Sequence, residues 1–108
     1  MPAARDDYLL RLITQAAAAL RRLREQLGHG SADEVVREAG TAIGQLLGPQ
    51  RALLEMLDAA TAARSLGNPD TVRAWSDLLM LQADAEAVRG NESAATRLRT
   101  RAAALLAL

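Results

Sequence analysis

The sequence predicts an all-α fold, and three observations lead to this prediction. Ala, Leu and Arg, which favour helices more than most residues do, make up much of the chain, and all 13 basic residues are Arg. Apolar residues recur every three or four positions over long stretches, as they do on one face of a helix. Glycine, which commonly follows the last turn of a helix, stands where four of these patterns stop, at Gly28, Gly48, Gly67 and Gly90.

These boundaries divide the chain into five helices within a single domain over residues 1–108. No connection between them exceeds about four residues, and connections that short make sequential helices pack antiparallel. We therefore expect a compact up-down array of five antiparallel helices, over residues 5–27, 32–47, 49–66, 69–89 and 92–107.

The first predicted helix has the longest apolar pattern in the chain. Its stripe comprises Tyr8, Leu9, Leu12, Ile13, Ala16, Ala19, Leu20, Leu23 and Leu27. Asp6 and Asp7 are expected in its first turn, where negative charge interacts favourably with the helix dipole. Leu10 and Ala17 widen the apolar arc beyond what one neighbouring helix covers.

The second helix is predicted to begin at Ser31, which forms a capping box with Glu34. Gly40 and Gly44 lie inside this helix, one turn apart, and each costs about 1 kcal/mol relative to Ala. Two interpretations are open here: another helix approaches closely at the glycines, or the glycines form a hinge.

The last three helices are predicted from similar boundary signals. Pro49 is suited to the first turn of the third helix. Asn68 and Pro69 are typical of the first positions of a helix, and they begin the fourth. Gly90 and Asn91 then end the fourth helix and begin the fifth.

Composition and charge argue against several classes of function. The 13 acidic residues balance the 13 Arg, whereas nucleic-acid-binding domains usually carry a basic excess. The chain has no Cys, so disulfides, thiolate metal sites and thiol nucleophiles are absent. Asp6 and Asp7 stand where a signal peptide needs positive charge, and Arg11 interrupts the apolar stretch that follows. We expect a cytoplasmic protein without a membrane partner.

The sequence offers no catalytic constellation. His29 is the only His, in a Gly-His-Gly loop that contains no second His or Cys to complete a metal site. Asp84 and Glu86 diverge on their helix, whereas Glu55 and Asp58 are predicted to share a solvent-facing helix surface. We therefore expect no enzyme activity, no catalytic residue, no metal and no cofactor.

The leading hypothesis is a protein–protein interaction or self-association module whose partner the sequence does not identify. Tyr8 and Trp75, the only aromatic residues, both belong to apolar stripes, so we expect them in the core and as interface residues only where exposed. The candidate interface residues are Tyr8, Leu10, Ala17 and Trp75. We predict a homodimer with the first helix at or near its interface.

The alternative is a domain that binds a small anion, a phosphate ligand or nucleic acid through Arg. Arg residues cluster at 21–24 and again at 97–101, and the candidate binding residues are Arg21, Arg97 and Arg101. A basic strip requires the first and last helices to lie side by side. No aromatic residues alternate with these Arg residues for base stacking, which makes nucleic acid the less favoured ligand.

Two parts of the chain carry a resemblance to known proteins. The first is the run DYLLRLITQ at residues 7–15, an acidic and an aromatic residue before an apolar–Arg–apolar–Ile helix. The second is the C-terminal half, with Leu53-Leu54, Leu57-Asp58, Gly67-Asn68-Pro69, a leucine-rich helix, Gly90-Asn91 and Arg101-Ala102. Together they resemble a family of short, uncharacterised bacterial proteins that are all-helical. The Arg and Ala content also suggests a bacterial genome rich in G and C.

The last two predicted helices also resemble a tetratricopeptide hairpin. Small residues stand where that repeat prefers them, at Ala83, Gly90, Ala95 and Ala102. The chain departs from the repeat at Glu86 and Arg99, where large apolar side chains are usual, and one hairpin is too short for a solenoid. The resemblance implies a helical interaction fold and assigns no active-site residue.

Overall fold

The computed structural model describes residues 2–107, with the side chains of residues 6–107. Every regular element in this range is helical, so the all-α prediction is confirmed. The elements are α1 (Pro2–Leu27), α2 (Ala32–Leu47), the short 3₁₀ helix η1 (Gly48–Gln50), α3 (Arg51–Met56), α4 (Ala59–Leu66), α5 (Pro69–Val88) and α6 (Glu92–Leu106).

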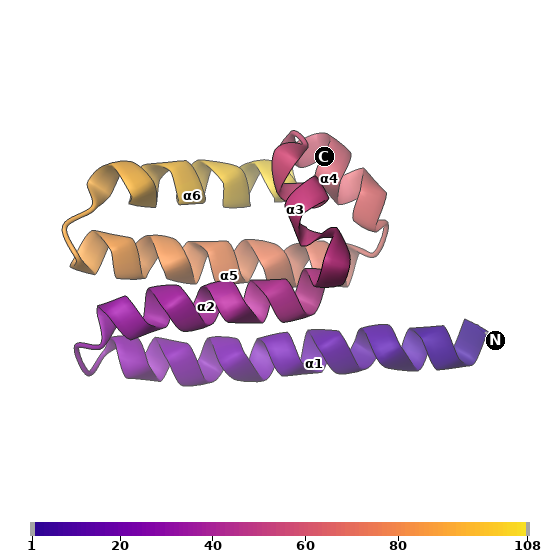
Figure 1. Ribbon diagram of the computed structural model, residues 1–108, viewed down its shortest axis with the longest axis horizontal. Coiled ribbons are helices and arrows are strands. Elements are labelled where there is room, and N and C mark those ends of the chain that lie inside the picture. Colours follow the sequence, from indigo (N-terminus) through magenta and orange to yellow (C-terminus); the bar gives the residue numbers. More distant parts are fainter. Residues whose placement is uncertain (1, 108) are drawn as a thin grey trace.

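Four long helices lie in the order α1, α2, α5 and α6 across the molecule, and α3 and α4 pack at one end of them (Figure 1). The neighbours α1 and α2 run antiparallel, as do α5 and α6, in agreement with the short connections. α1, α2 and α5 contact one another pairwise, while α6 packs on α5 and α4. Within the described residues α6 contacts neither α1 nor α2, so α5 is the central helix.

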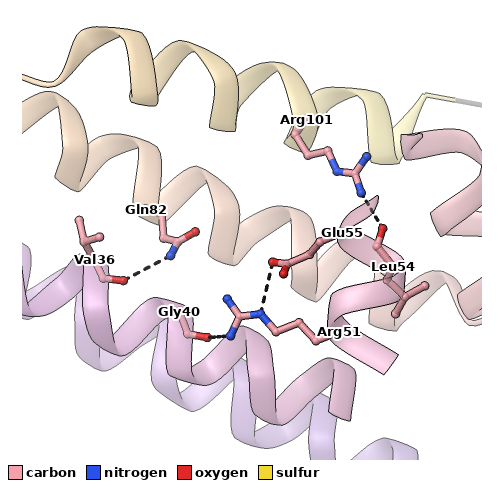
Figure 2. Close-up of polar contacts among 7 residues, drawn as sticks. All are labelled: Val36, Gly40, Arg51, Leu54, Glu55, Gln82 and Arg101. Carbon is pink, nitrogen blue, oxygen red and sulfur yellow. Dashed lines mark hydrogen bonds and ion pairs between the residues drawn. The ribbon is translucent and has the colours of Figure 1, made fainter. Parts of the chain in front are cut away.

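α5 is anchored on both sides by buried side chains and by polar bonds. Its nearly inaccessible side chains include the largest in the core, Trp75, Leu78 and Leu81. Ser76 Oγ donates to the carbonyl oxygen of Ala102 in α6 at 2.9 Å. On the other side, Gln82 Nε2 donates to the carbonyl oxygen of Val36 in α2 at 3.3 Å (Figure 2). These bonds fix the rotation of α5 against both neighbours.

The segment expected as one helix over 49–66 is divided at Leu57 and Asp58. Both residues are extended, and Asp58 is the N-cap of α4. Its Oδ2 accepts from the backbone N of Thr61 at 3.1 Å, and its Oδ1 accepts from Thr61 Oγ1 at 2.6 Å. These hydrogen bonds stabilise the charged carboxylate and lower the pKa of Asp58. Glu55 and Asp58 therefore belong to different helices and do not share the predicted surface.

Two predicted helix starts differ from the structure. α1 begins three residues earlier than expected, so Asp6 and Asp7 lie beyond its first turn. Ser31 is the N-cap of α2, as predicted, but its side chain makes no capping hydrogen bond. Glu34 instead accepts a hydrogen bond from Gln26 Nε2 of α1 at 3.0 Å, so the predicted capping box does not form.

The predicted start of α5 agrees with the structure. Asn68 Oδ1 accepts from the backbone N of Asp70 at 2.8 Å and of Thr71 at 3.3 Å, and Pro69 is the first helical residue. The similar prediction at Asn91 holds only in part, because Asn91 is the N-cap of α6 but makes no side-chain capping bond.

Gly40 and Gly44 make room for a side chain of α3 rather than for a hinge. α2 is continuous through both residues. Arg51 Nη1 donates to the carbonyl oxygen of Gly40 at 2.7 Å, while its Nε pairs with Glu55 at 3.3 Å (Figure 2). A Cβ at Gly44 would lie 2.9 Å from Arg51 Nη1, and one at Gly40 would lie 3.4 Å from Gln82 Nε2. The glycines therefore serve packing, but the groups that approach them are the side chains of Arg51 at Gly44 and of Gln82 at Gly40, not the helix expected from the sequence.

Candidate interaction surface

α1 lies at the edge of the array and is more exposed than its apolar pattern predicts. In Figure 1 its N-terminal part extends beyond the ends of the other helices. Among residues 6–27, only Ala16 and Leu23 are buried. Leu12 and Leu20 pack partly against the core. Ala19 and Leu27 also pack partly against it, whereas Tyr8, Leu10 and Ala17 are exposed.

The two aromatic residues lie in opposite environments. Trp75 is 1% exposed, which confirms it as a core residue and removes it from the candidate interface. Tyr8 is 55% exposed, so its expected burial is wrong, and it stays available to a partner. The reason is position: Trp75 lies in the central helix, whereas Tyr8 lies near the projecting end of the edge helix.

An apolar row follows α1 on the side that faces α5. Leu10 is 62% exposed, and it lies three residues before Ile13 and seven before Ala17, so the three side chains share one helix face. A groove of about 210 Å³ continues this face between α1 and α5. Its lining comprises Ile13, Ala16, Ala17 and Leu20 from α1 and Asp70, Arg73, Ala74 and Asp77 from α5. The α1 wall is wholly apolar and the α5 wall is mostly charged.

The groove on the other side of α1, toward α2, has a different chemistry. It holds about 490 Å³, and its lining includes Gln15, Arg22 and Glu38. Arg22 Nη2 and Glu38 Oε1 form an ion pair of 3.8 Å across it. Tyr8 lies seven residues before Gln15, so it belongs to this more polar side and not to the row that contains Leu10.

The basic strip that the anion-binding alternative requires does not form. α1 and α6 make no contact within the described range, and α5 lies between them in Figure 1. Arg21 is exposed on α1, whereas Arg97 is exposed on α6, where its Nη1 donates to Ser93 Oγ at 2.8 Å. The structure therefore keeps Arg21 and Arg97 apart.

Arg101, the third candidate for anion binding, is turned toward the protein. Its Nη1 donates to the carbonyl oxygen of Leu57 at 2.7 Å, and its Nη2 to that of Leu54 at 3.0 Å (Figure 2 shows the bond to Leu54). Its guanidinium carbon lies 5.3 Å from the ring centre of Trp75. Arg101 thus donates one hydrogen bond from each terminal nitrogen to carbonyls at the C-terminal end of α3, and it covers the core tryptophan.

The titratable groups considered for chemistry are dispersed. His29 is exposed in its loop. Glu86 pairs with Arg89 at 2.8 Å, and Asp84 pairs with Arg99 at 3.4 Å, so these two carboxylates have separate partners. Within the described residues, no three metal-binding side chains of the His, Asp or Glu type converge on one point. None of the described helices is both long and apolar enough to cross a membrane.

Sequence reasoning selected Leu10 and Ala17 as surface residues but assigned Ile13 and Leu20 wholly to the core stripe. The structure leaves both half-buried, in one row with the first two. The signal that links them is the spacing, because residues separated alternately by three and four positions stay on one narrow helix face. The α5 wall of the groove had no comparable signal, since it depends on tertiary packing.

Comparison of the chain with models of protein families, with curated proteins and with solved structures finds no match. The resemblance to bacterial helical proteins and to a tetratricopeptide hairpin therefore stays a prediction from the residues that carry it.

Proposed function

We propose that this chain is a non-catalytic self-association module that forms a homodimer through the α1 face, which we define as Leu10, Ile13, Ala17 and Leu20. The observation that supports the proposal most is the row itself. Leu10 is 62% exposed, and the three further residues line an apolar groove wall that the chain's own helices leave open. Apolar surface of this kind is stabilised when a partner covers it, by about 25 cal/mol per Å².

The other exposed apolar side chains form a weaker candidate. Leu53 and Met56 belong to α3, which has only 6 residues, and Val88 is at the end of α5. Leu53 and Met56 lie three residues apart and form a pair, but a small exposed apolar group is common on globular proteins, whereas an extended row marks an interface. The α1 face spans three helical turns, so a second helix can lie along it.

A structural rather than chemical role agrees with the polar groups. His29 stands alone in its loop, and Asp84 and Glu86 are each paired with an Arg. The absence of Cys supports a reducing compartment such as the cytoplasm as the place where the protein works.

Light scattering and sedimentation equilibrium from micromolar to millimolar concentration test the proposal. The wild-type chain is expected to have twice the mass of a monomer. Leu10→Glu should give a monomer, because it buries an unpaired carboxylate at the interface. Leu53→Glu is the matched control, since Leu53 is 60% exposed and the substitution is the same, and it should remain a dimer.

A wild-type chain that stays monomeric at millimolar concentration contradicts the proposal. So does a dimer that Leu53→Glu dissociates and Leu10→Glu does not, because it places the interface on α3. Circular dichroism of each variant shows that its helices are intact.

A further inference from the structure

Two charged residues extend the α1 face into a longer row. In order along α1 the row comprises Asp6, Leu10, Ile13, Ala17, Leu20 and Arg24. The separations alternate between four and three residues, as in one seam of a coiled coil. Asp6 and Arg24 are both exposed, and among the described residues neither forms an ion pair. An acid therefore stands at one end of an apolar row and a base at the other.

The row is self-complementary when it is reversed. Asp6 and Arg24 lie equally far from Gln15 along the helix, as do Leu10 and Leu20, and as do Ile13 and Ala17. An antiparallel second copy centred at Gln15 sets each residue opposite the other member of its pair. At each end of the row the Asp6 carboxylate then lies opposite the Arg24 guanidinium. At the centre the large side chain of Ile13 lies opposite the small Ala17, and the symmetry repeats this pair.

We propose that two copies of this chain pair through antiparallel α1 helices along this row, about a two-fold axis at the level of Gln15. The inference rests on the proposed self-association and adds its direction and register. A two-fold interface uses one surface patch twice, and this row supplies such a patch. Ala17 opposite Ile13 lets the helices approach to the usual distance of about 8–10 Å.

The charges select the antiparallel direction. A parallel pair in the same register sets Asp6 against Asp6 and Arg24 against Arg24, which repel. On the α5 side, Asp70, Arg73 and Asp77 border the row, so the apolar surface has a polar rim of the kind seen at interfaces. The apolar residues supply affinity, and the charged ends supply direction and register.

Charge reversal tests the register. Asp6→Arg places an Arg opposite Arg24 of the other copy at both ends of the interface, and Arg24→Asp places an Asp opposite Asp6 in the same way. Because like charges repel, each single variant should raise the dimer dissociation constant about tenfold in sedimentation equilibrium at low salt. The double variant Asp6→Arg with Arg24→Asp restores opposite charges at both ends and should dimerise like the wild type. Arg11→Asp is the matched control, because Arg11 is exposed on α1 but outside the row, and it should change little.

Engineered cysteines test the direction in a chain that has none of its own. Asp6 of one copy lies about 27 Å from Asp6 of an antiparallel second copy, at 1.5 Å per residue. Asp6→Cys alone and Arg24→Cys alone should therefore not form disulfides, whereas an equimolar mixture should crosslink. Two outcomes overturn the antiparallel register while self-association through α1 stands. In one, each single cysteine variant forms disulfides with itself. In the other, Leu10→Glu dissociates the dimer but the single charge reversals do not weaken it. A monomeric wild type overturns both the register and the self-association.

Discussion

α1 is longer than α5, at 26 residues against 20, yet α5 buries nine side chains and α1 buries two among those described. α1 carries the longer apolar stripe, but α5 is the more apolar helix per residue, so composition contributes to the difference. The two helices also differ in their neighbours: α5 contacts α1, α2, α4 and α6, whereas among the described residues α1 contacts only α2 and α5. The number of packed neighbours, together with apolar content, therefore determines how much of a helix becomes core.

The end of α5 where α3 and α4 pack shows how this chain completes a buried region. We call this region the Trp75 corner, consisting of Trp75, Arg101 and the carbonyls of Leu54 and Leu57. There the guanidinium donates to the carbonyls of Leu54 and Leu57 and lies over the indole, whose own Nε1 is buried without a hydrogen-bond partner among the described residues. The α1 face is covered only in part by its own chain, since Ile13 and Leu20 are half-buried whereas Leu10 and Ala17 are exposed. The comparison predicts that substitutions at the corner change stability, whereas those on α1 change association.

The largest expected effect is at the centre of the corner. Trp75→Ala should lower the free energy of unfolding by about 3–5 kcal/mol, because it removes the largest fully buried side chain and leaves a cavity. Tyr8→Ala, which truncates the exposed aromatic residue of α1, should change it by no more than about 0.5 kcal/mol. Urea denaturation followed by circular dichroism, at a concentration that dissociates any dimer, measures both. If both variants lost the same free energy of unfolding, α1 would be as tightly packed at Tyr8 as α5 is at Trp75.

A smaller effect is expected at Arg101. Arg101→Ala removes two hydrogen bonds from a charged donor and a cation–π contact, so it should cost about 2 kcal/mol of unfolding free energy. Arg101→Lys should recover only part of this, because an ammonium does not match the two carbonyls as the planar guanidinium does. Arg21→Ala on α1 is the control and should stay within about 0.5 kcal/mol. Denaturation in urea compares the three. An Arg101→Ala protein as stable as the Arg21→Ala protein would contradict a structural role for Arg101.

Helical periodicity predicted much of the fold because the signals for it are local. The 3–4 spacing of apolar residues located the long helices, and Asn68 with Pro69 fixed the start of α5, where Asn68 accepts hydrogen bonds from Asp70 and Thr71. Division of the third predicted helix was also signalled locally, by Asp58 three residues before Thr61. Because the apolar spacing continues through Leu57, the pattern did not reveal this division.

The candidate site was less predictable because it depends on contacts between distant parts of the chain. Periodicity gives the phase of Tyr8 on its helix but not the number of neighbours around it. Arg101 was grouped with exposed arginines because its acceptors, the carbonyls of Leu54 and Leu57, are 47 and 44 residues away. Gly44 indicated a close approach, but the sequence did not identify Arg51 as the approaching group.

The smallest expected effect is a pH dependence at Asp58, next to the Trp75 corner. Hydrogen bonds from Thr61 hold the pKa of its carboxyl below the ordinary value of 3.8. Since the folded pKa is the lower one, the stabilisation is present above pH 3.8 and is lost as the pH falls through the folded pKa. Asp58→Asn keeps one capping oxygen but cannot titrate. The stability difference between the wild type and this variant, measured by urea denaturation, should therefore shrink on acidification. A difference at Asp58 that is constant with pH would mean that the capping carboxylate is not held in its charged form.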